Sequence, residues 1–164
     1  MRLTAKRRYA MMAMADLASH SRGGPIPLAD IAERQQISLS YLEQLFAKLR
    51  RGGLVKSVRG PGGGYLLARP AENTLARAAE NTRASDIILA VGEPLRQTGC
   101  TPGSPGECAA SKNHCLSHDL WEELGNQIYL YLNSVSVADV CEGRVPDTSR
   151  TIHHAEPSPP VAAE

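Results

Sequence analysis

Three of the four cysteines lie close together in a segment that is poor in core-forming residues. This segment, "GCTPGSPGECAASKNHCLSH", runs from Gly99 to His118 and otherwise consists mainly of Gly, Pro, Ser, Thr and Ala. Cysteine thiolates and histidine imidazoles are the ligands that proteins use for zinc and for some iron–sulfur clusters. We therefore expect the segment to hold a metal centre, unless its thiols form disulfides or act as free redox groups.

The candidate ligands are Cys100, Cys108, Cys115 and His118, with the spacing C-x7-C-x6-C-x2-H. His118 is preferred to His114 because it follows Cys115 by three residues, so that both side chains can project from one helical turn. Three thiolates and one imidazole suit tetrahedral zinc, and they equally suit a small cluster. No two cysteines have the close C-x2-4-C spacing of a typical structural zinc site. The spacing leaves zinc and a cluster equally open, with redox-active thiols as a third interpretation.

The length and composition predict a globular protein. The chain has 164 residues, of which 42% are hydrophobic, and this is enough for a core. No apolar run approaches the 18 residues of a membrane span. Asp16 interrupts the apolar run near the amino terminus, which argues against a signal peptide. We expect a cytoplasmic protein, and a reducing cytosol disfavours structural disulfides.

Charge is distributed unevenly along the chain. Residues 1–60 contain eleven Lys and Arg against four Asp and Glu, whereas residues 61–164 contain seven against thirteen. A basic amino-terminal third indicates a polyanionic partner. The alternative is a solvated basic face without a partner.

The amino-terminal part shows the pattern of three helices. We predict helices from Leu3 to His20, from Pro27 to Gln36 and from Ser38 to Gly53. Hydrophobic residues at helical spacing give the third helix one buried face. Ser40 and Glu43 have the spacing of a capping box at its start.

A β-hairpin is predicted to follow these helices. Two β-prone runs, Leu54–Val58 and Tyr65–Leu67, flank a glycine-rich tip. The order of helix, short helix, turn, helix and hairpin is that of a winged helix-turn-helix, whose second helix of the pair enters the major groove of DNA. The predicted fold is therefore mostly α, with a small hairpin as the wing.

The polar face of the third helix carries side chains that can read DNA. Amide and hydroxyl groups contact base edges, and a carboxylate can accept a hydrogen bond from cytosine. The candidate DNA-binding residues are Ser38, Ser40, Tyr41, Glu43 and Gln44, with Arg59 at the hairpin tip. Neighbouring Lys48, Arg50, Arg51 and Lys56 are expected beside phosphates. A face for protein contacts is the alternative, but the helix order, the basic charge and the wing together favour DNA.

Glu43 has two interpretations. It would be repelled by phosphates, so it could serve only in the capping box. It could instead select operators that offer a cytosine amino group, at a cost in affinity.

A short internal repeat follows the hairpin. Residues 67–74, "LARPAENT", are succeeded by residues 75–82, "LARAAENT". We interpret this as the duplication of an exposed connector, which surface loops tolerate, and assign it no function. A short helix is predicted from Ala84 to Gly92, with Ser85 as its N-cap.

The carboxy-terminal part contains a long amphipathic helix from His118 to Val135. A short helix is predicted at residues 136–143, and the following tail, rich in Pro, Ser, Thr and Ala, is predicted to be disordered. Cys141 has the apolar neighbours Val137 and Val140. It is interpreted as a packed thiol and not as a metal ligand.

The residues quoted above resemble a known family. The stretches "ISLSYLEQLF" and "VRGPGGGYLL", and the cysteine segment ending in "CLSHDLWEEL", closely resemble the IscR family of iron–sulfur cluster regulators. The resemblance covers roughly residues 1–140. It implies a homodimeric winged-helix transcription factor and not an enzyme.

The resemblance also implies roles for individual residues. It implies a 2Fe–2S cluster held by Cys100, Cys108, Cys115 and His118, supplied by the iron–sulfur assembly machinery. It implies that the loaded protein represses cluster-assembly genes by binding double-stranded DNA operators, and that the cluster-free form can still bind a second operator class. The operator contacts map onto Ser38, Ser40, Tyr41, Gln44 and Arg59, and the residue that tunes operator choice onto Glu43. The dimer contacts map onto Trp121, Leu124, Ile128 and Leu132.

The sequence departs from the pattern of these relatives in three places. The gaps between the cysteines are longer, by about two residues and one residue, within a segment of small flexible residues. The duplication lies between the wing and the next helix. Arg8 stands where nitric-oxide-sensing relatives carry an acidic ligand, which argues against their type of site.

The expected organisation has five parts. These are a winged helix-turn-helix domain at 1–68, a connector with a short helix at 69–94, a cluster loop at 95–118, a dimerisation helix region at 117–142 and a disordered tail at 143–164. A winged-helix repressor with structural zinc or redox thiols is the first alternative. A cluster carrier that keeps a winged domain is the second.

Overall fold

The computed structural model describes residues 4–21, 24–68, 75–92 and 118–146. Within these ranges the chain forms seven helices and one two-stranded antiparallel sheet. The prediction of a mostly α fold with a small hairpin is confirmed. In the described ranges, no helix is both long and apolar enough to cross a membrane.

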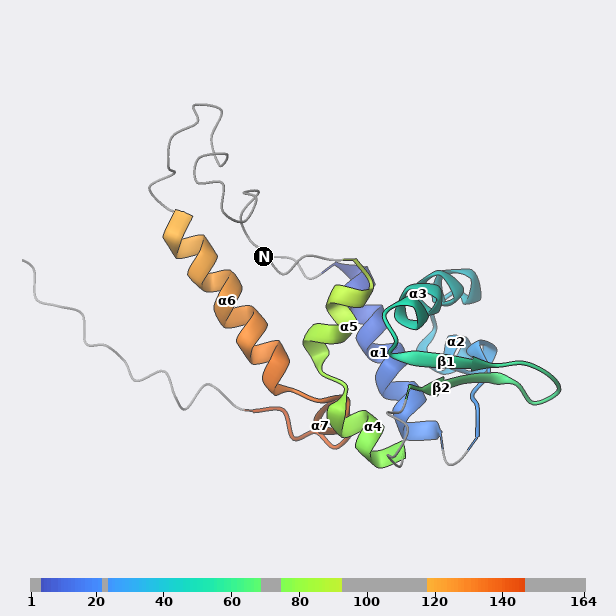
Figure 1. Cartoon of the computed structure of the whole chain (residues 1–164). Helices are drawn as coiled ribbons and strands as arrows, with labels where there is room; N and C mark the ends of the chain where they lie inside the picture. Colours follow the sequence, from blue (N-terminus) through green and yellow to red (C-terminus); the bar gives the residue numbers. More distant parts are fainter. Residues whose placement is uncertain (1–3, 22–23, 69–74, 93–117, 147–164) are drawn as a thin grey trace, which may run out of the picture.

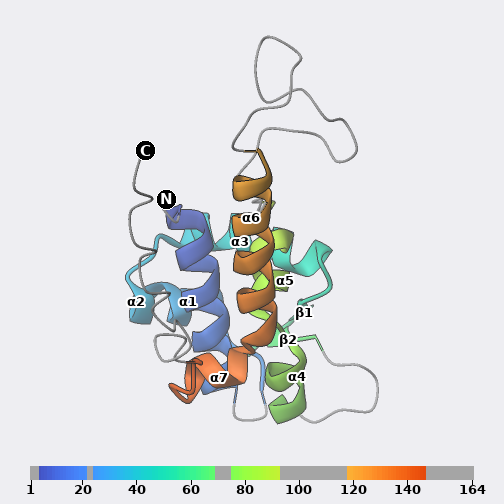
Figure 2. The same ribbon diagram turned by 90° about the vertical axis from the view of Figure 1, so that its left-hand side faces the viewer.

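Helix α1, Ala5–His20, is the central element of the fold. Thr4 caps its start, where the Thr4 Oγ1 accepts a hydrogen bond from the Arg7 amide at 3.4 Å. The helix packs against α2 on one side and against α5 and α7 on another (Figures 1 and 2). Its fully buried apolar side chains are Ala10, Ala13, Met14 and Leu17.

Helices α2, Leu28–Gln35, and α3, Leu39–Arg51, form the predicted helix-turn-helix. Gln36 allows the tight turn because it adopts a left-handed conformation with φ of 53°. The apolar stripe of α3 is buried as expected, and it consists of Leu42, Leu45, Phe46 and Leu49. The predicted capping box is wrong, because the N-cap is Ser38 and Ser40 already lies in the first turn.

The wing is an antiparallel hairpin of β1, Val55–Val58, and β2, Gly64–Leu67. Ile26 extends it through an isolated bridge, in which the amides and carbonyls of Ile26 and Tyr65 exchange hydrogen bonds of 2.9 and 2.8 Å. Glycine is required at position 64 because a Cβ there would lie 2.3 Å from the Ile26 carbonyl oxygen. Phe46 of α3 meets Tyr65 edge-on, with ring centroids 4.9 Å apart, so the wing is fixed to α3.

The second copy of the repeat is not an exposed connector. It folds as helix α4, Leu75–Asn81, in which Ala78 and Ala79 are buried. The N-cap predicted for the next helix is also wrong. Helix α5, Ala84–Ala90, is capped at Arg83, and Ser85 is buried with its Oγ donating to Asn133 Oδ1 at 3.1 Å.

Helices α6, His118–Ser134, and α7, Val137–Cys141, complete the described chain. Helix α6 lies against α5, on the opposite side of the molecule from the hairpin (Figure 1). Helix α7 packs on α1 and α4. The buried cluster that contains α1 and α3 therefore also includes Ala78, Ile87, Val91 and Val137, so one core continues past residue 68.

Candidate nucleic-acid interface and metal centre

The polar face of α3 is open to solvent. Ser38, Ser40, Glu43 and Gln44 are exposed, while the opposite face of the helix is buried in the core. Tyr41 is half-buried, and its ring meets the Tyr9 ring edge-on at 6.0 Å between centroids. The ring of Tyr41 therefore helps to join α3 to α1, in addition to the role predicted for it at DNA.

Basic side chains surround this face. Arg50, Arg51 and Arg59 are exposed at the end of α3 and at the start of the hairpin turn. Arg50 lies beside the wing, where its Nη1 donates to Ser57 Oγ at 3.5 Å. Lys48, for which a phosphate neighbour is predicted, is half-buried and donates to the Val91 carbonyl at 3.3 Å. It ties the end of α3 to the end of α5.

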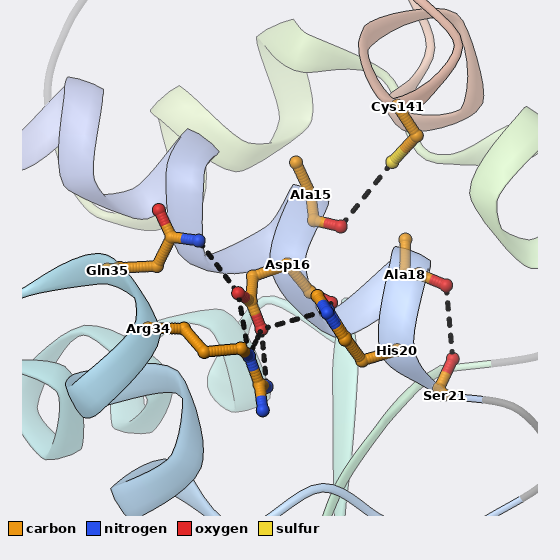
Figure 3. A network of polar contacts seen from close by, with 8 residues as sticks. All are labelled: Ala15, Asp16, Ala18, His20, Ser21, Arg34, Gln35 and Cys141. Atoms are coloured by element: carbon orange, nitrogen blue, oxygen red, sulfur yellow. Dashed lines mark hydrogen bonds and ion pairs between the residues drawn. The ribbon is translucent and has the colours of Figure 1, made fainter.

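A polar network that was not predicted from the sequence joins α1 to the end of α2. Asp16 of α1 has a fully buried side chain, and its carboxylate accepts hydrogen bonds from Arg34 and Gln35 at the end of α2 (Figure 3). Burial raises the pKa of Asp16, but the hydrogen bonds from Arg34 and Gln35 and the charge of Arg34 outweigh it and hold the pKa below its usual value. An acidic residue inside an apolar helix was the only signal in the sequence for this role.

The predicted metal ligands lie mostly outside the described residues. Cys100, Cys108 and Cys115 belong to residues 93–117, and His118 is the first residue of α6. Among the described residues, no three His, Cys, Asp or Glu side chains gather to hold a metal ion.

Cys141 differs from its prediction as a packed thiol. The residue is exposed, and its Sγ donates to the Ala15 carbonyl of α1 at 3.4 Å (Figure 3). The short helix α7 ends at this residue, so that the packed side chains of α7 lie nearer its start.

Helix α6 carries a large apolar surface that the described part of the chain leaves uncovered. Trp121 and Leu124 are 44% and 39% exposed, while Ile128 and Leu132 are half-buried. Further exposed apolar side chains on the helix are Leu120, Tyr129, Leu130 and Tyr131. So many exposed apolar side chains on one helix indicate an interaction site.

A groove of about 530 Å³ lies beside this helix, along α1. Its apolar lining includes Met11, Met12 and Ala15 of α1 together with Leu132 of α6 and Val140 of α7. Arg7 and Arg8, near the amino-terminal end of α1, also line the groove. An apolar groove next to an apolar helix face can accept a second helix.

The helix pair, the exposed face of α3 and the attached hairpin define a winged helix-turn-helix DNA-binding protein. The sequence matches the Rrf2 family, described as iron-dependent transcriptional regulators, over residues 3–143. This chain belongs to the Rrf2 family and is a DNA-binding transcriptional regulator. Its family consists of regulators and not of enzymes.

Individual relatives agree with this assignment. The HTH-type transcriptional regulator IscR of Yersinia pseudotuberculosis is 51% identical over 140 residues, which cover 85% of this chain and 79% of the relative. Among solved structures, T. potens IscR has a TM-score of 0.65 at 35% identity, covering 88% of both chains. CymR, the global cysteine regulator of B. subtilis, has a TM-score of 0.66 at 29% identity, covering 87% of this chain and 98% of that one.

Proposed function

We propose that this chain is a homodimeric regulator that senses iron–sulfur clusters and represses cluster-assembly genes when its cluster is bound. The observation that carries the proposal is the Cys₃His donor set immediately before and at the start of α6, in a chain 51% identical to regulators named IscR. The family description as iron-dependent regulators supports it further. The protein would act in the cytoplasm and obtain its cluster from the iron–sulfur assembly machinery.

The donor set fits a 2Fe–2S cluster. Cys100, Cys108 and Cys115 would supply three thiolates and His118 one imidazole, and mixed thiolate and imidazole ligation of a 2Fe–2S cluster occurs in Rieske centres. The cluster would supply a redox-sensitive and labile metal centre. Because an imidazole must be neutral to bind a metal, ligation by His118 would weaken as the pH falls through the range in which histidine becomes protonated. Zinc suits the same four ligands, and the metal content of the purified protein distinguishes the two.

The operator would be read by α3 and the wing. Exposure of Ser38, Ser40, Glu43 and Gln44 on one helix face supports direct contact with base edges in the major groove. Glu43 would select operators that present a cytosine amino group, since its carboxylate is not engaged as the cap of α3. Tyr41 would contribute its hydroxyl from a ring held against Tyr9.

The dimer would form through α6. Its exposed apolar side chains would pack into the groove along α1 of the partner, with the stripe of Trp121, Leu124, Ile128 and Leu132 at the interface. Charge complementarity supports this arrangement. The first turns of α6 carry exposed Asp119, Glu122 and Glu123, and the groove is lined at one end by Arg7 and Arg8.

Cluster binding would change operator choice through a coupling free energy between two sites. A cluster that binds one form of the dimer more tightly shifts the population toward that form, and DNA favours cluster binding by the same factor. Such couplings are typically about 1–3 kcal/mol, or roughly 5- to 150-fold in affinity. The hydrogen bond from Lys48 to the Val91 carbonyl joins α3 to the end of α5. Residues 93–117, which contain the three candidate cysteine ligands, follow α5 closely in the sequence.

DNA binding through the wing is tested with Arg59→Ala. Arg59 is exposed beside the hairpin turn, so its loss removes one contact to the negatively charged groove. We expect weaker binding and a salt dependence of the binding constant that is smaller by about one unit of slope. Fluorescence anisotropy with an operator duplex at several salt concentrations measures both.

Arg144→Ala is the matched control for this variant. Arg144 is also exposed, but it lies beyond α7 and is ion-paired with Glu142. We expect its salt slope to equal that of the unmodified protein. If Arg59→Ala left the salt dependence of the binding constant unchanged, the wing would be excluded from the DNA interface.

A further inference from the structure

The carboxylate of Asp16 holds the end of α2 from within α1. Its Oδ1 accepts from Arg34 Nη2 at 2.6 Å, Arg34 Nε lies 3.1 Å from both oxygens, and Gln35 Nε2 donates to Oδ2 at 2.7 Å (Figure 3). The forked guanidinium and the amide together fix the carboxylate in two directions. A contact of this geometry restrains orientation more tightly than a single hydrogen bond.

This contact is placed directly before the recognition helix. Arg34 and Gln35 are the last residues of α2, Gln36 makes the left-handed turn, and Ser38 is the N-cap of α3. Asp16 therefore anchors the turn that sets the direction of α3. Because α3 follows directly from this turn, a small rotation at the turn would move the exposed face of α3 relative to the rest of the molecule.

The same part of α1 also contacts the carboxy-terminal helices. The carbonyl of Ala15, the preceding residue, accepts from Cys141 of α7 at 3.4 Å. Asp16, His20 and Gln35 line the groove beside Leu132 of α6. The anchor thus lies between the helix-turn-helix and the surface through which the proposed dimer would form.

We propose that Asp16 is a positioning residue for operator binding, which sets the angle of each recognition helix relative to the dimer so that two half-sites are read together. The inference rests on the proposed homodimer. A dimer gains affinity from two half-sites only when both recognition helices reach successive major grooves at once. If the contact from Asp16 were lost, α2 and α3 could still bind one half-site. The dimer would then lose much of the additional affinity that the second half-site provides.

The test compares Asp16→Asn with the unmodified protein on two duplexes, one with two half-sites and one with a single half-site. Asparagine keeps the shape and one acceptor oxygen, and Arg34 is 33% exposed, so its charge can turn toward water. We expect the affinity for the single half-site duplex to change by less than about twofold. The ratio of the affinities for the two-site and single-site duplexes, which we call the two-site advantage, should fall by roughly tenfold or more, within the range that avidity supplies. Asp30→Asn, the same change at an exposed position of α2, is the control and should keep the full advantage.

Arg34→Lys provides a second variant should Asp16→Asn fold poorly, because it keeps the charge at a partly exposed position and removes the fork. We expect the same selective loss, of smaller size. Equal loss on both duplexes, or lower thermal stability with an unchanged two-site advantage, would show a merely structural contact and overturn the positioning role. An unmodified protein without any two-site advantage would instead overturn the dimeric operator complex, and the positioning role with it.

Discussion

Replacing Cys108 by alanine is expected to remove the metal centre and to leave a folded dimer. The residue would supply one of four ligands, and its loss would leave the cluster without one of the bonds that hold it. We expect iron and sulfide to fall from about two each per chain to nearly none. Metal analysis, visible absorption and gel filtration of the anaerobically purified variant measure this directly.

Cys141→Ala is the matched control for this experiment. It removes a thiol that is exposed and donates to the Ala15 carbonyl, and that is not one of the four proposed ligands. We expect full cluster content in this variant. Loss of the dimer in Cys108→Ala would make the centre structural and contradict a sensor, whereas loss of the cluster in Cys141→Ala would show that the ligand set is wrong.

Leu124→Glu is expected to convert the dimer into a monomer. Leu124 belongs to the exposed apolar surface of α6, and a glutamate there would place an unpaired charge in the proposed interface. Central interface residues contribute about 2 kcal/mol or more, and a buried unpaired charge adds to this loss. We expect the dissociation constant of the dimer to rise by at least about 100-fold, since each 1.4 kcal/mol is tenfold.

Analytical ultracentrifugation over a range of concentrations measures this shift. Asn126→Glu adds the same charge at an exposed polar position of the same helix and should remain dimeric. Circular dichroism of both variants separates dissociation from unfolding. If the Leu124→Glu variant had the same dimer dissociation constant as the Asn126→Glu variant, this face of α6 would be excluded from the interface.

The sequence predicted those elements whose signals are local. The stripe of Leu42, Leu45, Phe46 and Leu49 has helical spacing, so the buried face of α3 could be assigned before its packing was known. The glycine-rich turn between two β-prone runs likewise predicted the hairpin. The resemblance to cluster regulators rests on these same segments, and the family assignment confirms it.

Helix starts were less predictable, because several residues near a start can cap it equally well. Ser38 and Ser40 both suit an N-cap, and the backbone conformation of Ser38 decides between them. Ser85 suited a cap too, but tertiary packing buries it against Asn133. The repeat was misinterpreted because Ala78 and Ala79 become buried only when α4 packs against α7 and β2.

The role of Asp16 could not be inferred from local sequence. Its partners Arg34 and Gln35 are 18 and 19 residues away, and the contact exists only because α1 and α2 pack together. An acidic residue in an apolar helix indicates some buried partner, without indicating which one. The exposed state of Cys141 depends in the same way on where α7 ends.

Anaerobic purification followed by absorption spectroscopy, with iron, sulfide and zinc counted per chain, is the decisive test of cluster sensing. We expect visible absorption with about two irons and two sulfides per chain and little zinc. A colourless protein with one zinc per chain would keep the DNA-binding regulator but would contradict cluster sensing, because the three cysteines would then form a structural site.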